Sequence, residues 1–161
     1  MQRRVLFVCT GNIFRSVTAE YALRAALGDG DRFIIESAGT EDYPHVVKPV
    51  VRDYLLEKGL DVRAHRRRTV TAAMLARPTL VIAMSTEHRK ALRDQFGIVD
   101  APLFTAACGF AEEPLPDVDE AVADHATNVV AADAHVRATI DRIIVATPRL
   151  ADRLVVEARA R

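Results

Sequence analysis

The chain alternates between short, continuous apolar runs and segments whose apolar residues recur at helical spacing. Continuous runs rich in β-branched residues are typical of strands buried on both faces. The pattern predicts strands at residues 5–9, 33–36 and 79–84, with a weaker fourth strand at 103–104.

The segments between these runs predict helices, several of which end at a glycine. We expect helices at residues 16–27, 50–58, 71–76 and 86–96, and a helical region from about residue 119 onward. Pro148 lies inside that last region. Because proline lacks the backbone N–H that a helix interior needs, it predicts a division into two helices.

Strands that alternate with helices predict an α/β fold, in which a parallel sheet is covered by helices on both faces. We therefore expect a three-layer protein with a four-stranded, parallel, twisted sheet, formed as a single domain by residues 1–161. Ligands of such sheets bind beyond the carboxyl ends of the strands. Cys9, at the end of the first strand, lies where chemistry is expected.

Composition narrows the class of protein without identifying it. Half of the residues are hydrophobic, 27% are charged and the formal net charge is zero, so nothing general favours binding to nucleic acid or to an anionic membrane. No apolar run approaches the ~18 residues of a membrane span, and the run after the first four residues is too short for a secretory signal. Two cysteines do not make a disulfide framework, and we expect a cytoplasmic protein.

The most informative segment follows the first strand and reads as a tight loop leading into a helix. Five residues separate Cys9 from Arg15, so successive backbone N–H groups can converge on one point, where the helix N-terminus adds positive charge. Gly11 and Asn12 both tolerate left-handed backbone angles. The guanidinium of Arg15 can grip two oxygens of a tetrahedral anion, and Cys9 at the floor of this bowl is expected to be a thiolate. The predicted phosphate-binding residues are Thr10, Gly11, Asn12, Ile13, Phe14, Arg15 and Ser16.

A cysteine at the end of a strand is also often just a small buried apolar residue. The strand–loop–helix context argues against that alternative here. The segment is not a nucleotide-binding P-loop either, since the Gly-x-x-x-x-Gly-Lys-Ser/Thr pattern does not occur.

This segment resembles the N-terminal signature of the low-molecular-weight protein tyrosine phosphatase family, in which Cys-x5-Arg-Ser/Thr follows the first strand. Further stretches similar to the family follow in order at 37–40 (Ser-Ala-Gly-Thr), 59–61 (Gly-Leu-Asp), 65–68 (His-Arg-Arg-Arg) and 83–84 (Ala-Met). The resemblance covers about residues 4–145 and implies the same doubly wound fold. On composition alone, the three arginines at 66–68 form a solvated basic patch.

The resemblance implies hydrolysis of a phosphomonoester through a cysteinyl-phosphate, without metal or cofactor. Cys9 would be the nucleophile and Arg15 would clamp the phosphate. Four further residues would shape the loop or stabilise the leaving thiolate: Asn12, Ser16, Ser37 and His65. The partner would be a phosphorylated protein or a small phosphate ester, and the oligomeric state is open.

The family's general acid is an aspartate of a late loop, usually followed by proline and aromatic residues. Here the corresponding stretch is 113–119, where Asp117 follows a proline and is our choice. Asp119 is the alternative, although it can also cap the next helix. Since the aromatic residues are missing, Tyr43 would form the remaining wall of a phosphotyrosine slot, and a small phosphomonoester is an alternative substrate.

Two rival functions stay open at this point. Arsenate reduction on the same fold needs a second cysteine for thiol exchange, and only Cys108 is present, while Phe14 stands where the family often has one. A non-catalytic anion-binding module would keep the loop and lose the acid. The five histidines show no ligand spacing with either cysteine, so no metal site is predicted.

Overall fold

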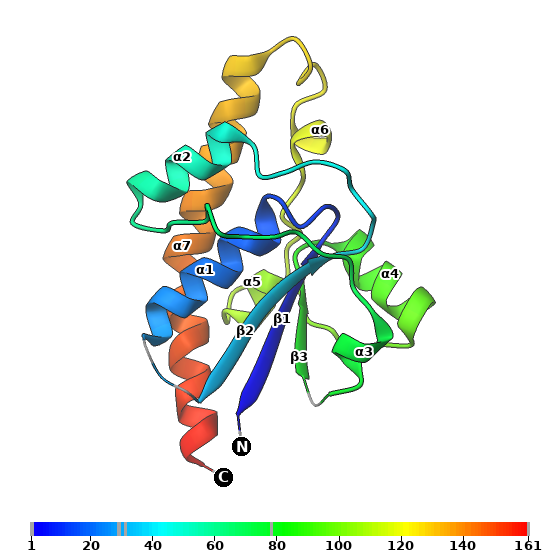
Figure 1. The fold of residues 1–161 in the computed structure, drawn as a ribbon, viewed down its shortest axis with the longest axis vertical. Helices are drawn as coiled ribbons and strands as arrows, with labels where there is room; N and C mark the ends of the chain where they lie inside the picture. The colour runs from blue at the N-terminus through cyan, green and yellow to red at the C-terminus, as the bar shows by residue number, and fades with distance from the viewer. Residues whose placement is uncertain (1, 29, 31, 78, 161) are drawn as a thin grey trace.

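The computed structural model describes residues 2–28, 30, 32–77 and 79–160. Its centre is a parallel sheet in the order β2-β1-β3 (Figure 1). The strands are β1 (Arg3–Cys9), β2 (Phe33–Gly39) and β3 (Thr79–Ala83). The three longer strands of the sequence prediction are confirmed.

The helices lie between and after the strands. Their bounds are α1 (Arg15–Leu27), α2 (Pro49–Glu57), α3 (Ala72–Leu75), α4 (Thr86–Phe96), α5 (Phe104–Ala107), α6 (Val118–Ala121) and α7 (Val129–Arg159). The first four agree with the predicted helices to within one residue at either end. Glycines follow several helix ends as expected, and Gly97 closes α4 in the left-handed conformation.

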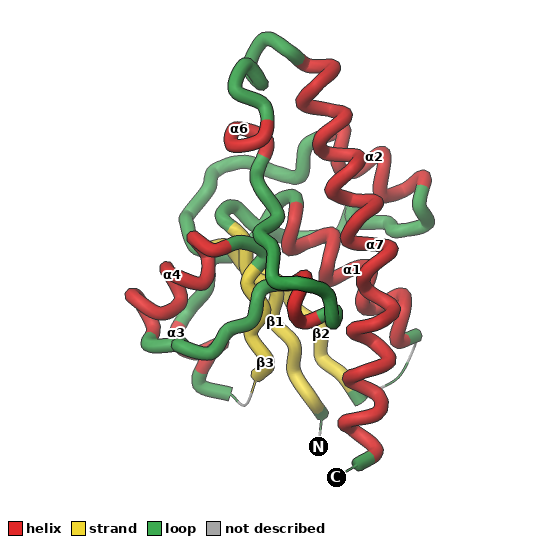
Figure 2. The backbone as a smooth tube through the Cα atoms, turned by 180° about the vertical axis from the view of Figure 1, so that it is seen from behind, coloured by secondary structure: helices red, strands yellow, loops and turns green. Residues whose placement is uncertain are grey.

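The central strand β1 explains why the sheet is covered on both faces. Val5 and Phe7 point into a core shared with α1, α5 and α7, whereas Leu6 and Val8 point into a second core shared with α3 and α4. All four are at most 1% exposed, as the continuous apolar run predicts. In Figure 2, α1 and α7 lie on one side of the strands and α3 and α4 on the other.

The predicted fourth strand at 103–104 is wrong. Leu103 makes only an isolated parallel bridge to Ala83, and α5 begins at the next residue. Pro102 accepts a hydrogen bond from the Ala83 backbone N–H, but it has no N–H to return. The ladder therefore stops after one bridge.

The predicted break at Pro148 is also wrong, because α7 continues through it. The proline costs the helix about 3 kcal/mol. Beyond it, Leu150 and Leu154 are only 2% exposed in the core, and each contributes about 1.5–3 kcal/mol of burial. Packing of the second half of the helix therefore outweighs the lost hydrogen bond.

The carboxyl ends of β1 and β2 are in close contact where the loop after Cys9 begins. The backbone N–H of Thr40 donates to Cys9 O at 2.9 Å, and that of Glu41 donates to Thr10 O at 3.1 Å. Gly39 lies against the same loop, and a Cβ atom there would stand 2.4 Å from Thr10 O. Only glycine allows the two strand ends to approach this closely.

We therefore predict that Gly39→Ala destabilises the fold and displaces the loop. Overpacking of this kind costs about 1–3 kcal/mol, which lowers the Tm by several degrees, measurable by thermal unfolding. Gly30→Ala is the matched control, because a Cβ atom at that position would have no neighbour within 4 Å. Equal Tm values for the two variants would contradict the close approach at Gly39.

Candidate active site

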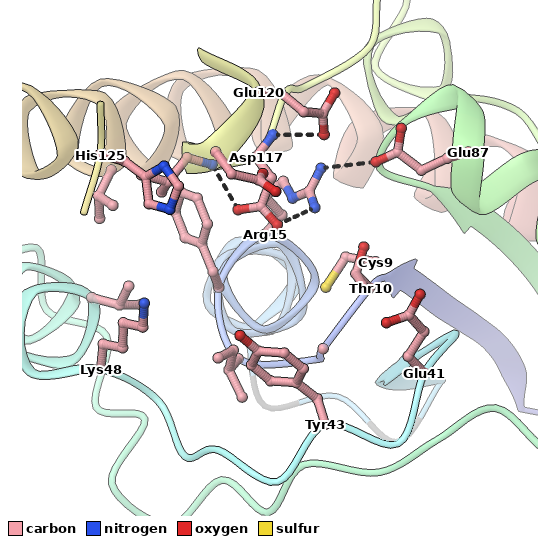
Figure 3. A pocket seen from close by; sticks show the side chains of 17 residues that line it. Cys9, Thr10, Arg15, Glu41, Tyr43, Lys48, Glu87, Asp117, Glu120 and His125 are labelled. Atoms are coloured by element: carbon pink, nitrogen blue, oxygen red, sulfur yellow. Dashed lines mark hydrogen bonds and ion pairs between the residues drawn. The ribbon is translucent and has the colours of Figure 1, made fainter. Parts of the chain in front are cut away.

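A pocket of about 510 Å³ opens beyond the carboxyl end of β1. Cys9 and the loop 10–14 form its floor with Arg15, and the loop after β2 and the segment around α6 form two of its walls (Figure 3). Cys9 at the end of β1 and Arg15 at the start of α1 thus line one cavity. It lies beyond the carboxyl ends of the strands, where the sequence predicted a site.

The loop 10–14 owes its shape to Asn12. This residue has φ = 57° and is the only non-glycine residue with positive φ in the described chain. Asparagine tolerates this left-handed conformation better than most residues. Gly11, which also tolerates such angles, does not have a positive φ; a Cβ there would instead meet the ring of Tyr43 at 3.1 Å.

The side chain of Asn12 is fully buried and uses all of its hydrogen-bonding groups. Its amide nitrogen donates to Ser16 Oγ at 2.9 Å and to Ser37 Oγ at 2.8 Å. Its Oδ1 accepts the backbone N–H of Arg68 at 3.1 Å. Because a backbone N–H only donates, the orientation of the amide is fixed.

The direction of these bonds extends to the sulfur of Cys9. Ser16 Oγ accepts a hydrogen from Asn12, so its own hydrogen is free for Cys9 Sγ, 2.9 Å away. A hydrogen bond donated to the sulfur orients it and stabilises negative charge that develops on it. The chain Asn12–Ser16–Cys9 therefore directs a donor at the sulfur.

The other end of the network terminates on a buried carboxylate. Ser37 Oγ donates to Glu20, which is 5% exposed and forms an ion pair with Arg24. His65 Nε2 donates to the backbone carbonyl of Asn12 at 3.0 Å, and burial lowers the pKa of His65. Ser37 and His65 thus both contact Asn12.

Arg15 is the largest side chain that is almost completely buried, at 1% exposure. Its Nη1 donates to Leu115 O at 2.8 Å, and its Nη2 donates to Asp117 Oδ2 at 2.9 Å. Its Nε has no partner among the described residues. Helix α1 begins at Arg15 without a side-chain cap, so the N–H groups of its first turn are available to an anion.

The two candidate acids occupy different surroundings. Asp117 pairs with Arg15 and also caps α6, where its Oδ1 accepts the Val118 N–H and Glu120 completes a capping box. The expectation that Asp119 caps this helix is therefore wrong. Asp119 lines the same pocket from an exposed position.

Tyr43 lines the pocket opposite Arg15 and Asp117 (Figure 3). Its ring packs edge-on against His45, with centroids 4.6 Å apart. The aromatic residues absent from the late loop are replaced by aliphatic ones, Val118 and, from α7, Val136. The slot therefore keeps apolar walls.

Carboxylates outnumber cations around the pocket. Five carboxylates line it, those of Glu41, Glu87, Asp117, Asp119 and Glu120, against the two cations of Arg15 and Lys48. Burial raises the pKa of Glu87, and repulsion by Glu120 raises it further. The pocket lining thus favours a ligand that carries positive charge in addition to an anionic group.

Several residues that contact the site could not be assigned to it from the sequence. Arg67 belongs to the expected basic patch, yet its Nε donates to Gly11 O at 3.0 Å and its Nη2 to Glu41 O at 2.8 Å. His88 contacts Thr10 from α4, and Glu20 supports Ser37 from α1. A charged residue at helical spacing looks the same in sequence whether it faces solvent or a loop.

The second cysteine does not belong to the pocket lining. Cys108, at the C-cap of α5, is 0% exposed in the core, and burial raises the pKa of its thiol to about 12. Such a thiol stays protonated and unreactive. Thiol exchange between the two cysteines, which arsenate reduction would need, gains no support.

Neither a metal-binding cluster nor a membrane-spanning helix is found in the described residues. No group of three or more His, Cys, Asp and Glu side chains is arranged to hold a metal ion among them. No helix in the part of the chain described is long and apolar enough to cross a membrane.

Comparisons with known proteins identify a family and a fold. The model of the family described as low molecular weight phosphotyrosine protein phosphatase matches residues 4–150. The protein-arginine-phosphatase of Bacillus subtilis is 31% identical over 103 residues, 63% of this chain and 68% of that protein. The low molecular weight protein-tyrosine-phosphatase Etp of Escherichia coli K12 is 35% identical over 85 residues, which are 52% of this chain and only 55% of Etp.

The fold is also found among solved structures. The YwlE arginine phosphatase from Geobacillus stearothermophilus superposes with a TM-score of 0.78 at 24% identity, covering 96% of this chain and 94% of that one. At this identity the likeness concerns the fold.

Proposed function

Because the family model spans residues 4–150, the chain belongs to the low molecular weight phosphotyrosine protein phosphatase family, and we propose that it hydrolyses phosphorylated residues of proteins through Cys9. The observation that supports this most is the directed hydrogen-bond chain from Asn12 through Ser16 to Cys9 Sγ, at the floor of a pocket that also contains a buried arginine. A merely structural cysteine would need neither the donor nor the arginine.

In the first step, Cys9 Sγ attacks the phosphorus of the substrate. The S–P bond forms while the bond between phosphorus and the leaving oxygen breaks. The loop N–H groups, the N-terminus of α1 and Arg15 face the three remaining phosphoryl oxygens, where negative charge is held in the transition state.

Asp117 is proposed to protonate the leaving oxygen. In the unliganded site its carboxylate pairs with Arg15, so the phosphoryl group and Asp117 compete for the same guanidinium. When the phosphoryl oxygens take Arg15, Asp117 loses its cationic partner and lies beside a second negative charge. Both changes favour its protonated form, which is the form a general acid requires.

In the second step, water attacks the phosphorus of the cysteinyl-phosphate and loses its proton to the Asp117 carboxylate. The S–P bond breaks, and inorganic phosphate leaves. Ser16 stabilises the departing thiolate through the hydrogen bond that it already donates to Cys9. The atoms balance with water as the only co-reactant.

Phosphotyrosine fits the pocket's apolar lining. Six side chains supply that lining: Ile13, Phe14, Tyr43, Val51, Val118 and Val136. A phenyl ring can be held by such walls while its phosphate reaches the floor. A phosphotyrosine residue of a protein is therefore our first choice of substrate.

We predict that Cys9→Ser abolishes turnover of phosphotyrosine peptide and of an aryl phosphate while leaving binding of vanadate or inorganic phosphate measurable. The serine hydroxyl is a much weaker nucleophile, but the loop and Arg15 remain. Wild-type activity should survive chelators. Cys108→Ala is the matched control and should keep the turnover of the folded enzyme; full activity in Cys9→Ser would end the covalent proposal.

Asp117→Asn tests the acid, because asparagine still caps α6 but cannot donate the proton. We predict a rate loss of up to about 10²–10⁴-fold for phenyl and alkyl phosphates and a much smaller loss for nitrophenyl phosphate, whose leaving group needs little protonation. The basic limb of the pH–rate profile should flatten. Asp119→Asn should change little, and the reverse ranking would move the acid to Asp119.

A second candidate substrate is phosphoarginine, which the carboxylates of the pocket favour. A phosphorylated guanidinium carries positive charge beside its phosphoryl group, so it can meet Glu87 and Glu120 while the phosphate lies on Arg15. The similarity to the protein-arginine-phosphatase of B. subtilis supports the same choice. Tyrosine carries no such charge.

Comparison of the two substrates with one variant separates these candidates. If the substrate is phosphoarginine, Glu87→Gln should lower kcat/KM for a phosphoarginine peptide by about two- to five-fold, the effect of a partly exposed charge pair, and should not lower it for phosphotyrosine. Glu57→Gln, exposed at the end of α2 outside the pocket, is the control. Exclusive turnover of phosphotyrosine would reject this candidate.

A further inference from the structure

His88 lies in the first turn of α4 and contacts Thr10 of the loop 10–14. It is 1% exposed, and its Nε2 is 2.9 Å from Thr10 Oγ1. Its Nδ1 is buried and has no partner among the described residues. The buried imidazole thus makes one hydrogen bond, and that bond is to the loop beside Cys9. Leaving Nδ1 buried and unpaired costs folding free energy, and the proposed reaction does not explain this cost.

The missing partner at Nδ1 fixes which ring nitrogen carries the proton. A buried N–H without an acceptor is rarer and costlier than an unpaired acceptor. The proton therefore belongs on Nε2, where Thr10 Oγ1 accepts it. Glu87 Oε1, at 3.6 Å from Nε2, lies farther away on the same side and also favours a proton there.

This tautomer decides what the hydroxyl of Thr10 can do. Its oxygen accepts from His88, so its own hydrogen must point to a different acceptor. Thr10 lines the pocket directly beside Cys9 (Figure 3), where the proposed phosphoryl group would lie. A hydroxyl whose oxygen is held from behind is preorganised to donate into the pocket.

We infer that His88 is a positioning residue that orients the Thr10 hydroxyl as a hydrogen-bond donor to a phosphoryl oxygen of the bound substrate or product. The inference rests on the proposed function, because it assumes that a phosphoryl group occupies this pocket. It adds a side-chain donor to the N–H groups of the loop. It also gives α4, which already contributes Glu87 to the pocket lining, a second part in the site.

The surroundings of His88 keep this arrangement constant with pH. The charged groups nearest to it are Arg15 and Glu87. Burial, together with the positive charge of Arg15, lowers the pKa of His88 to about 3. The ring therefore stays neutral over the range in which a phosphatase works, and Thr10 keeps the same role throughout.

The test uses two amides of different length at position 88. His88→Gln places its amide nitrogen near the position of Nε2 and should restore the donor, whereas His88→Asn reaches only the position of Nδ1. We expect the Gln variant to bind inorganic phosphate as the wild type does. The Asn variant should bind it about five-fold more weakly, the effect of misorienting one hydrogen bond to a charged group. The Kd is measured by calorimetry.

A double-mutant cycle shows whether the effect passes through Thr10. His88→Asn should cost little further affinity in the Thr10→Val background, since the hydroxyl it would misorient is gone. Equal losses in both backgrounds, or equal binding by the Gln and Asn variants, would overturn the inference. Unfolding curves of each variant separate lost affinity from lost structure.

These outcomes are independent of the proposed reaction. If the wild type binds phosphate but turns over no phosphorylated peptide, the proposed function fails while the cycle still reports on His88 and Thr10. If turnover depends on Cys9 but the cycle shows no coupling, only the role of His88 fails. In the active enzyme, the Asn variant should also show weaker inhibition by the product phosphate.

Discussion

The left-handed backbone of Asn12 is the constraint on which the rest of the site depends. A non-glycine residue at φ = 57° is held there by three residues from two other segments: Ser37 in β2, and His65 and Arg68 from the stretch before β3. Because these contacts satisfy both the side chain and the carbonyl of Asn12, the loop has one shape before any ligand arrives. The same amide sets the direction of the hydrogen bond from Ser16 to Cys9. Loop geometry and sulfur chemistry are thus consequences of one residue.

That constraint explains which parts of the site the sequence could reveal. One continuous strand–loop–helix segment contains Cys9, Asn12, Arg15 and Ser16, so their spacing in the sequence alone brings them together. Glu20, Arg67 and His88 enter through contacts that only the folded chain defines; His88 is 78 positions from Thr10. Nothing in the local pattern of α4 distinguishes a histidine facing the loop from one facing solvent. Ser37 and His65 were found only because their neighbours resemble a known family.

The fold shows the same division between local and tertiary determinants. Continuous apolar runs predicted β1, β2 and β3, because residues buried on both faces, such as Val5–Cys9 and Val81–Ala83, leave a clear pattern. The two-residue run at 103–104 was too short to carry a strand, and the proline before it limits the ladder to one bridge. At Pro148 the sequence predicted a break that does not occur. Local propensity favours a break there, but the buried leucines that follow keep α7 continuous.

The pairing of Arg15 with Asp117 links binding to catalysis in the proposed reaction. An arginine buried to 1% exposure without a counter-charge would be costly, and Asp117 supplies that charge while the site is empty. A phosphoryl group can replace Asp117 on the guanidinium, because it offers more oxygens and more charge in the same place. The displaced carboxyl then lies next to the bond that must break, without its cation and beside an anion, which is where an acid is needed. The contact that stabilises the empty enzyme is therefore the one whose loss prepares the acid, and the capping bond from Val118 keeps Asp117 in position during the exchange.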